Sequence, residues 1–281
     1  MDARAADSHD GDWGGFPWTH GTRNAEVGFR DQETMFQWLP RGSPVFRLFH
    51  DIHLHTRFRR KEFLESICVL ERLWPVLLHW RHIIEVSAGH GLFGMLAAML
   101  VPGLETALLS DRRKPANYSE LLELIARHMP YVKRRVRYVE RPLHLVADWP
   151  DQRFVVAIHG CGALSDHIAE RAWRSGCSFA LVPCCMSPRL LAELTGSPLE
   201  QRCSPWTPEE LMERIMPLRV QRISSWGYAV FLSQIPPMIT PFNHILLALR
   251  PEHVPYLEIQ HNLPLCPLPP CGPEHQRFCR A

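Results

Sequence analysis

Short apolar strands alternate with helical segments through the middle of this sequence, and this alternation limits the folds that the chain can adopt. The strand candidates are residues 82–86, 105–110, 135–139, 154–158 and 179–182. Helical patterns run from Leu92 to Leu100, after the first strand, and from Leu164 to Arg174, after the fourth. Helices placed between successive strands predict a parallel sheet covered on both faces, which is an α/β fold.

Two helix starts and a late pair of strands complete the predicted domain. Asn117 precedes one helix and Thr207 another, and each has a glutamate three residues later, as in a capping box. Residues 228–233 and 244–249 are strand candidates that follow the last helix. Because no helical crossover separates them, they predict an antiparallel edge and bring the sheet to seven strands.

The chain is expected to divide into three segments. Residues 1–59 mix glycine, proline and polar residues without a sustained period, which predicts an irregular lead-in. Residues 60–250 hold the α/β domain, which begins with an amphipathic helix between Lys61 and Trp80. Prolines recur through residues 251–281 and predict an extended tail.

Composition excludes some classes of protein. Hydrophobic residues make up 46% and charged residues 21%, which excludes wholesale disorder. The net charge of +2 does not by itself indicate a nucleic-acid partner. The sequence has no secretory signal pattern, no long apolar run and an odd number of cysteines, 9. We therefore expect a cytoplasmic protein with reduced thiols and no membrane segment.

A glycine-rich turn follows the first strand and is the first candidate binding site. The run from Gly89 to Gly94 fits G-x-G-x-x-G between a strand and a helix, where a ligand can approach the backbone. This pattern alone allows either a nicotinamide dinucleotide or S-adenosylmethionine. Glu85, inside the end of the strand, disfavours a pyrophosphate and favours a cationic ligand or a structural link to the turn.

The segment resembles motif I of the class I S-adenosylmethionine-dependent methyltransferases, in which an acidic residue precedes a glycine-rich turn. The resemblance implies a Rossmann-like methyltransferase sheet and S-adenosylmethionine as cofactor, held by Glu85, Ser87, Gly89, Gly91 and Asp111. Ser87 stands where the family often has glycine. Asp111 ends the next strand, where the family has the carboxylate that accepts hydrogen bonds from the ribose hydroxyls.

A narrower resemblance lies further along the chain. HGCGALSD at His159–Asp166, Pro183-Cys184-Cys185 and TPFNH at 240–244 are similar to a methyltransferase subfamily that includes eukaryotic tRNA ribose 2′-O-methyltransferases. The resemblance covers about residues 60 to 250. It implies methyl transfer, with RNA slightly favoured as acceptor over a small molecule or a protein.

Three residues that follow separate strands are expected at one edge of the sheet, namely Asp111, His159 and Cys184. His159 is the first candidate for the base that takes the proton of the acceptor, and Asp166 either orients it or is itself the base. Alternatively, His159 and Asp166 tie a loop to a helix start. Cys184 is either a covalent nucleophile or a small side chain that fills space.

Two groups of residues could bind a metal ion. His159, Cys161, Cys184 and Cys185 have suitable ligand atoms, although their spacing matches no common zinc site. In the tail the candidates are Cys266, Cys271, His275 and Cys279, which form either a small zinc module or part of a disordered tail.

The basic runs at residues 57–61 and 133–137 could contact phosphates. RNA gains support as acceptor if both flank the cofactor site, and a small molecule or protein is favoured if they do not. Two other functions remain open for the same glycine pattern: a nicotinamide-dependent oxidoreductase and a binding scaffold without catalysis.

Overall fold

The computed structural model describes residues 44–55, 60–141, 149, 152–196, 206–235, 239–240 and 244–255. Within them, seven strands form one sheet in the order β3-β2-β1-β4-β5-β7-β6. The strands are β1 (His82–Val86), β2 (Thr106–Asp111), β3 (Val136–Glu140), β4 (Phe154–Ile158), β5 (Phe179–Val182), β6 (Ala229–Gln234) and β7 (His244–Leu249). Strands β1 to β5 are parallel, whereas β7 runs antiparallel to both β5 and β6.

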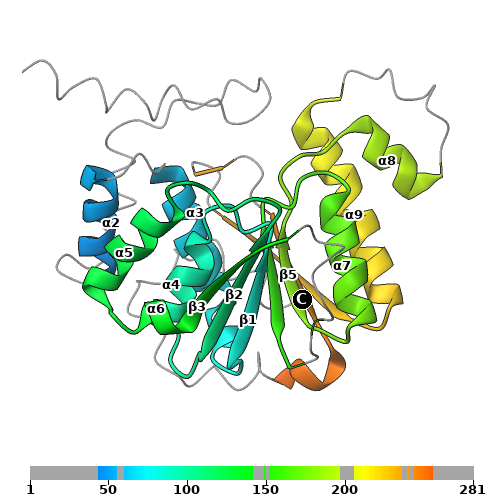
Figure 1. Cartoon of the computed structure of the whole chain (residues 1–281). Helices are drawn as coiled ribbons and strands as arrows, with labels where there is room; N and C mark the ends of the chain where they lie inside the picture. Colours follow the sequence, from blue (N-terminus) through cyan, green and yellow to red (C-terminus); the bar gives the residue numbers. More distant parts are fainter. Residues whose placement is uncertain are drawn as a thin grey trace, which may run out of the picture.

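Helices cover both faces of this sheet (Figure 1). They are α2 (Pro44–His55), α3 (Arg60–Leu77), α4 (Leu92–Leu100), α5 (Tyr118–His128), α6 (Val132–Arg135), α7 (Leu164–Arg174), α8 (Pro188–Thr195) and α9 (Pro208–Ser225). A 3₁₀ turn, η4 (Pro251–His253), follows β7. The predicted α/β fold, a seven-stranded sheet with helices on both faces, is confirmed.

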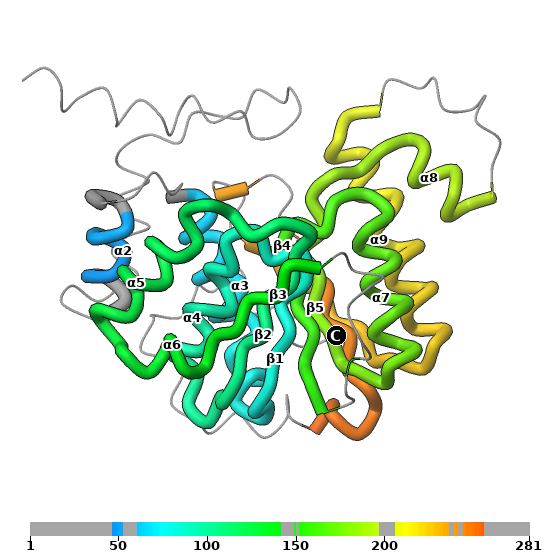
Figure 2. Tube along the Cα trace, viewed as in Figure 1, coloured from blue at the N-terminus to red at the C-terminus, as the bar shows by residue number. Residues whose placement is uncertain are grey.

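The core has two layers because successive side chains of a strand point to opposite faces. On β1, Ile83 packs into the layer that contains α3, α4 and α5, and its neighbour Ile84 packs into the layer of α7 and α9. Figure 2 shows these two groups of helices on either side of the sheet. Every residue of β4 and β5 is buried, as expected for central strands.

The structure differs from the sequence prediction at both ends of the domain. Residues 44–55 form α2, where we expected an irregular lead-in, and Leu48 and Ile52 of this helix are buried. The stripe of apolar residues in α2 was missed because glycine and proline dominate the sequence before it. Residues 251–255, the described start of the tail, form the η4 turn and its flank.

Of the two predicted capping boxes, one is present. At the start of α9, the backbone N–H of Thr207 donates to Oε2 of Glu210 at 2.7 Å, and the backbone N–H of Glu210 donates to Oγ1 of Thr207 at 3.2 Å. Asn117 precedes α5 as predicted, but its side chain makes no capping hydrogen bond. The predicted antiparallel pair of late strands is confirmed, with β6 as the outer strand.

Candidate active site

The winding of the chain reverses at β1, which lies between β2 and β4. In open α/β sheets, ligands bind outside the carboxyl ends of the strands at such a point. Asp111, His159 and Cys184 each end a parallel strand or follow it within two residues, on β2, β4 and β5. The sheet therefore brings these residues, which are far apart in sequence, to the same edge.

The turn after β1 contains three residues with left-handed backbone: Ser87 (φ 55°), Gly89 (φ 50°) and Gly91 (φ 71°). Glycine adopts this conformation at no steric cost, whereas serine is strained there. A Cβ atom at Gly91 would lie 2.2 Å from Cδ1 of Leu109 on β2, so a side chain at this position would force Leu109 to shift. A Cβ atom at Gly89 would meet nothing within 4 Å, and its backbone therefore borders open space.

Glu85 is a buried carboxylate at the end of β1. Its Oε2 accepts a hydrogen bond of 2.7 Å from the backbone N–H of Gly94 in the first turn of α4. Burial raises the pKa of Glu85 to about 8; the hydrogen bond from Gly94 opposes this rise, and the negative charge of Asp111 adds to it. Glu85 thus makes the structural link to the turn, and a cation bound nearby would favour its ionised form.

Asp111 lies directly against the glycine turn. Its Oδ2 accepts a hydrogen bond of 2.8 Å from the N–H of Gly89, and its Oδ1 accepts one of 2.6 Å from the N–H of Arg112. The hydroxyl of Tyr138 on β3 donates to the carbonyl of Gly89 at 2.8 Å. Gly89 is therefore held on both sides, by a carboxylate from β2 and a phenol from β3.

His159 follows β4 in a left-handed conformation, with φ 64°. Its Nε2 donates to Oε2 of Glu65 at 2.9 Å, and Nζ of Lys61 lies 3.3 Å from the other carboxylate oxygen of Glu65. Burial lowers the pKa of His159, but the charge and hydrogen bond of Glu65 outweigh it and raise the pKa overall. Glu65 was not predicted as a site residue, because the sequence places it on an ordinary amphipathic helix, and Lys61 was predicted only as part of a basic run that could contact phosphates.

Asp166 does not contact His159 in this structure. Its carboxylate forms an ion pair with the guanidinium of Arg219 on α9, with contacts of 2.7, 3.1 and 3.3 Å, and the side chain of Arg219 is 1% exposed. The same guanidinium donates to the carbonyl of Gly162 at 2.9 Å. Glu65, not Asp166, orients the imidazole; Asp166 joins α7 to α9 through Arg219, which also holds the loop after β4.

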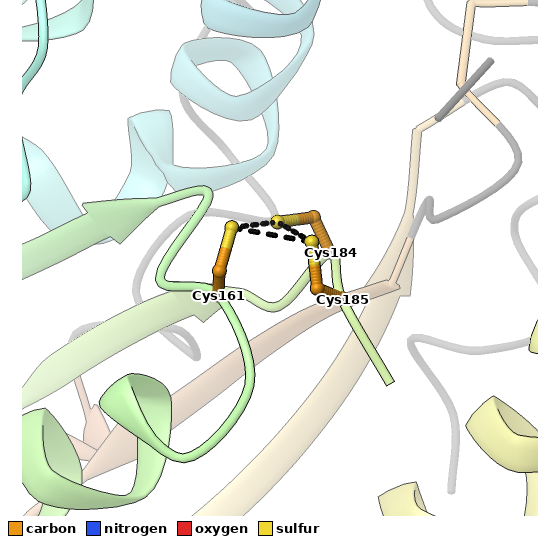
Figure 3. A group of neighbouring side chains, drawn as sticks. All are labelled: Cys161, Cys184 and Cys185. Atoms are coloured by element: carbon orange, nitrogen blue, oxygen red, sulfur yellow. Dashed lines mark hydrogen bonds between the residues drawn. The ribbon is translucent and has the colours of Figure 1, made fainter. Parts of the chain in front are cut away.

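The thiols of Cys161, Cys184 and Cys185, in the loops after β4 and β5, face one another (Figure 3). The sulfur of Cys161 lies 2.8 Å from that of Cys184 and 3.3 Å from that of Cys185, and the sulfurs of Cys184 and Cys185 are 3.5 Å apart. The hydrogen bond with Cys161, together with burial, raises the pKa of the Cys184 thiol far above its ordinary value. A raised pKa disfavours the thiolate that a covalent role for Cys184 requires.

The basic runs do not both flank the site. α6, which carries Lys133 and Arg134, precedes β3 and so lies at the amino edge of the sheet, opposite Asp111. Of the run at residues 57–61, Lys61 is buried against Glu65, and residues 57–59 lie outside the described residues. A basic run that the sequence analysis did not single out, Arg112, Arg113 and Lys114, is exposed directly after Asp111.

Other predictions cannot be placed. Cys266, Cys271, His275 and Cys279 lie outside the described residues, as do residues 241–243 of the TPFNH segment. Among the helices that the structure describes, none has the length and apolar character needed to cross a bilayer.

Comparison with known proteins gives a likeness of fold. No protein-family model matches the sequence, and no curated protein matches it. Among solved structures, an O-methyltransferase family protein from Burkholderia thailandensis is similar at 15% identity, covering 78% of this chain and 70% of that one, with a TM-score of 0.43. A SAM-dependent O-methyltransferase from Thermotoga maritima is similar at 13% identity, covering 72% and 71%, with a TM-score of 0.41. Likeness at this level does not assign an activity.

Proposed function

We propose that this protein transfers a methyl group from S-adenosylmethionine to an acceptor. The proposal depends on one contact, the hydrogen bond from the N–H of Gly89 to Asp111, because it joins the β2 carboxylate to the glycine turn at the point where the winding reverses. A carboxylate in this position can accept hydrogen bonds from the vicinal hydroxyls of a ribose. The open space at Gly89 allows the backbone to approach such a ligand.

Charge favours S-adenosylmethionine over a dinucleotide at this turn. The carboxyl groups of Glu85 and Asp111 lie close together, and the charge of Asp111 raises the pKa of Glu85. A pyrophosphate would add negative charge beside Asp111, whereas the sulfonium and ammonium groups of S-adenosylmethionine would offset the charge of Asp111 and favour ionisation of Glu85. When bound, S-adenosylmethionine supplies a methyl group activated by its sulfonium.

His159 is proposed to take the proton of the acceptor. Because Glu65 accepts a hydrogen bond from Nε2, that nitrogen carries a proton, and Nδ1 is the nitrogen that can accept one. The side chain of His159 is 35% exposed and can therefore be reached from solvent, whereas Glu65 is 1% exposed. Glu65 acts through His159 as a positioning residue that also raises its basicity.

The two predicted basic runs do not both flank the site and by themselves favour a small molecule or a protein as acceptor; RNA is tested as acceptor because of a third basic run. Arg112, Arg113 and Lys114 form an exposed basic run beside Asp111, at the same edge of the sheet as His159. Such a run is suited to phosphate contacts, and binding that depends on it should weaken as salt is added. The basic run at residues 133–137 gives no such support, because it lies at the opposite edge.

Calorimetry with S-adenosylhomocysteine and with NAD tests the cofactor assignment. We expect S-adenosylhomocysteine to bind, and Asp111→Asn to weaken its binding by about tenfold or more through the loss of charge-assisted hydrogen bonds. Glu140→Gln is the matched control, since Glu140 pairs with Asp111 in the sheet register and is exposed. Binding of NAD alone would contradict the proposal.

Transfer of a labelled methyl group to RNA, protein and small-molecule extracts tests catalysis and acceptor class. We expect label in the RNA fraction, lost in His159→Asn. Label in another fraction would replace RNA as the acceptor, and binding of S-adenosylhomocysteine without any transfer would favour a scaffold.

A further inference from the structure

The loops after β4 and β5 place three cysteine thiols around one point, and we propose that this cluster binds a thiophilic divalent metal ion, zinc in the first place. Figure 3 shows the sulfur atoms of Cys161, Cys184 and Cys185 facing one another. The ligand atoms of all three residues lie within 4.8 Å of one another. The proposal is independent of the proposed methyl transfer.

The sulfur spacing suits a metal better than a disulfide. The separations of 2.8, 3.3 and 3.5 Å all exceed the bond of about 2.05 Å in a disulfide. With zinc–sulfur bonds of about 2.3 Å, tetrahedral geometry requires sulfurs about 3.8 Å apart. A small outward rotation of the side chains reaches this distance, and Cys161 is exposed and has room for it.

The backbone around the cluster is held in place. The N–H of Gly162 donates to the carbonyl of Cys185 at 3.0 Å, and the N–H of His159 donates to the carbonyl of Val182 at 3.0 Å. The buried Arg219 holds the carbonyl of Gly162 from the other side at 2.9 Å. These bonds fix the two loops relative to each other before any ion binds, as supporting residues do at metal centres.

Binding of the zinc ion releases the protons of the three thiols. Three thiols and one zinc ion give a zinc tris-thiolate and three protons, which pass to solvent. The complex carries one negative charge. Three protein ligands leave the fourth tetrahedral position for water or another small ligand, on the exposed side of Cys161.

The test uses the full-length chain carrying Cys266→Ser and Cys271→Ser, so that the tail candidates do not contribute. Cobalt(II) is titrated under reducing conditions, and zinc affinity is then measured by competition with a chromophoric chelator. We expect thiolate-to-cobalt charge-transfer absorption, release of three protons per ion, and a zinc affinity at least about tenfold lower in Cys161→Ser and in Cys185→Ser.

Cys68→Ala is the matched control, since Cys68 is a buried thiol on α3 outside the cluster. It should leave the affinity unchanged, and circular dichroism checks that all variants are folded. X-ray absorption of the zinc form should show three sulfur neighbours at about 2.3 Å. The proposal would be overturned by the absence of the charge-transfer band, by zinc affinities of Cys161→Ser and Cys185→Ser equal to that of the parent chain, or by a disulfide within the cluster that persists in the folded chain under reducing conditions.

Discussion

Nε2 of His159 lies 2.9 Å from Oε2 of Glu65 and joins the carboxyl end of β4 to the middle of α3. The two residues are 94 positions apart in the sequence. Burial would disfavour the charge on Glu65, but His159 and Lys61 together hold its pKa below the ordinary value. A buried carboxylate supported in this way supplies a fixed negative charge beside the imidazole.

Glu65→Gln should lower the pKa of His159, because the variant loses the charge that raises it. NMR titration of the His159 ring measures this shift directly. If His159 is the base, the acidic limb of the pH–rate profile should move to lower pH in the same variant. Glu62→Gln, one turn earlier on α3 and paired with His90, is the matched control and should leave the titration of His159 unchanged. An unchanged His159 pKa in Glu65→Gln would show that Glu65 does not set its basicity.

Tyr138→Phe should weaken binding of S-adenosylhomocysteine by about three- to tenfold, because the loss of one hydrogen bond costs about 1 kcal/mol. The variant removes the donor to the carbonyl of Gly89 and so loosens the turn. Calorimetry measures the effect.

Tyr131→Phe is the control for that variant, since the Tyr131 hydroxyl donates to the carbonyl of Met99 away from the turn. Both variants should lose some stability, but the change in affinity should be confined to Tyr138→Phe. Equal affinities in the two variants would show that the clamp on Gly89 has no part in binding.

Much of the fold follows from local sequence patterns. The bounds predicted for β1, β4, β5 and β7 coincide with those of the structure. These strands are short apolar runs between turns, so their limits are marked in the sequence itself. α8 was not predicted, because eight residues are too few to show a clear helical period. Ser187, which caps this helix, was the one local signal.

The partners of the site residues were harder to predict. Spacing placed Glu85, Asp111 and His159 at strand ends, but it carries no information about which side chain reaches them from another element. Glu65 reaches His159 from α3, an element 94 positions away in the sequence. Arg219 had one signal: it falls four residues from Ile215 and from Ile223 on the buried side of α9, where an arginine needs a buried acceptor.

Ser87→Gly should stabilise the protein by about 0.5–1 kcal/mol. The left-handed conformation costs serine about 1–2 kcal/mol, and glycine removes this cost. The greater flexibility of glycine in the unfolded chain offsets part of the stability gained. Urea unfolding measures the change. Ser87→Ala keeps the strained φ and should give no gain, so stabilisation of equal size in both variants would contradict this account of the turn.

In Glu85→Gln, the free energy of unfolding should decrease less steeply as pH rises than it does in the unmodified chain. The native pKa of Glu85 is raised to about 8 from its ordinary value of 4.5, so between these values the native protein keeps a proton that the unfolded chain releases. The free energy of unfolding therefore decreases as pH rises through this window. Glutamine does not titrate, and its amide oxygen can still accept the hydrogen bond from Gly94.

Urea unfolding between pH 5 and pH 8 tests this expectation, with Glu140→Gln as the control for loss of an exposed carboxylate at the same edge of the sheet. As pH rises, the free energy of unfolding of Glu85→Gln should increase relative to that of the unmodified chain. The Glu140→Gln difference should stay constant across the same window. Parallel curves for Glu85→Gln and the unmodified chain would mean that the buried carboxylate is already ionised, with Gly94 and His159 outweighing burial and the charge of Asp111.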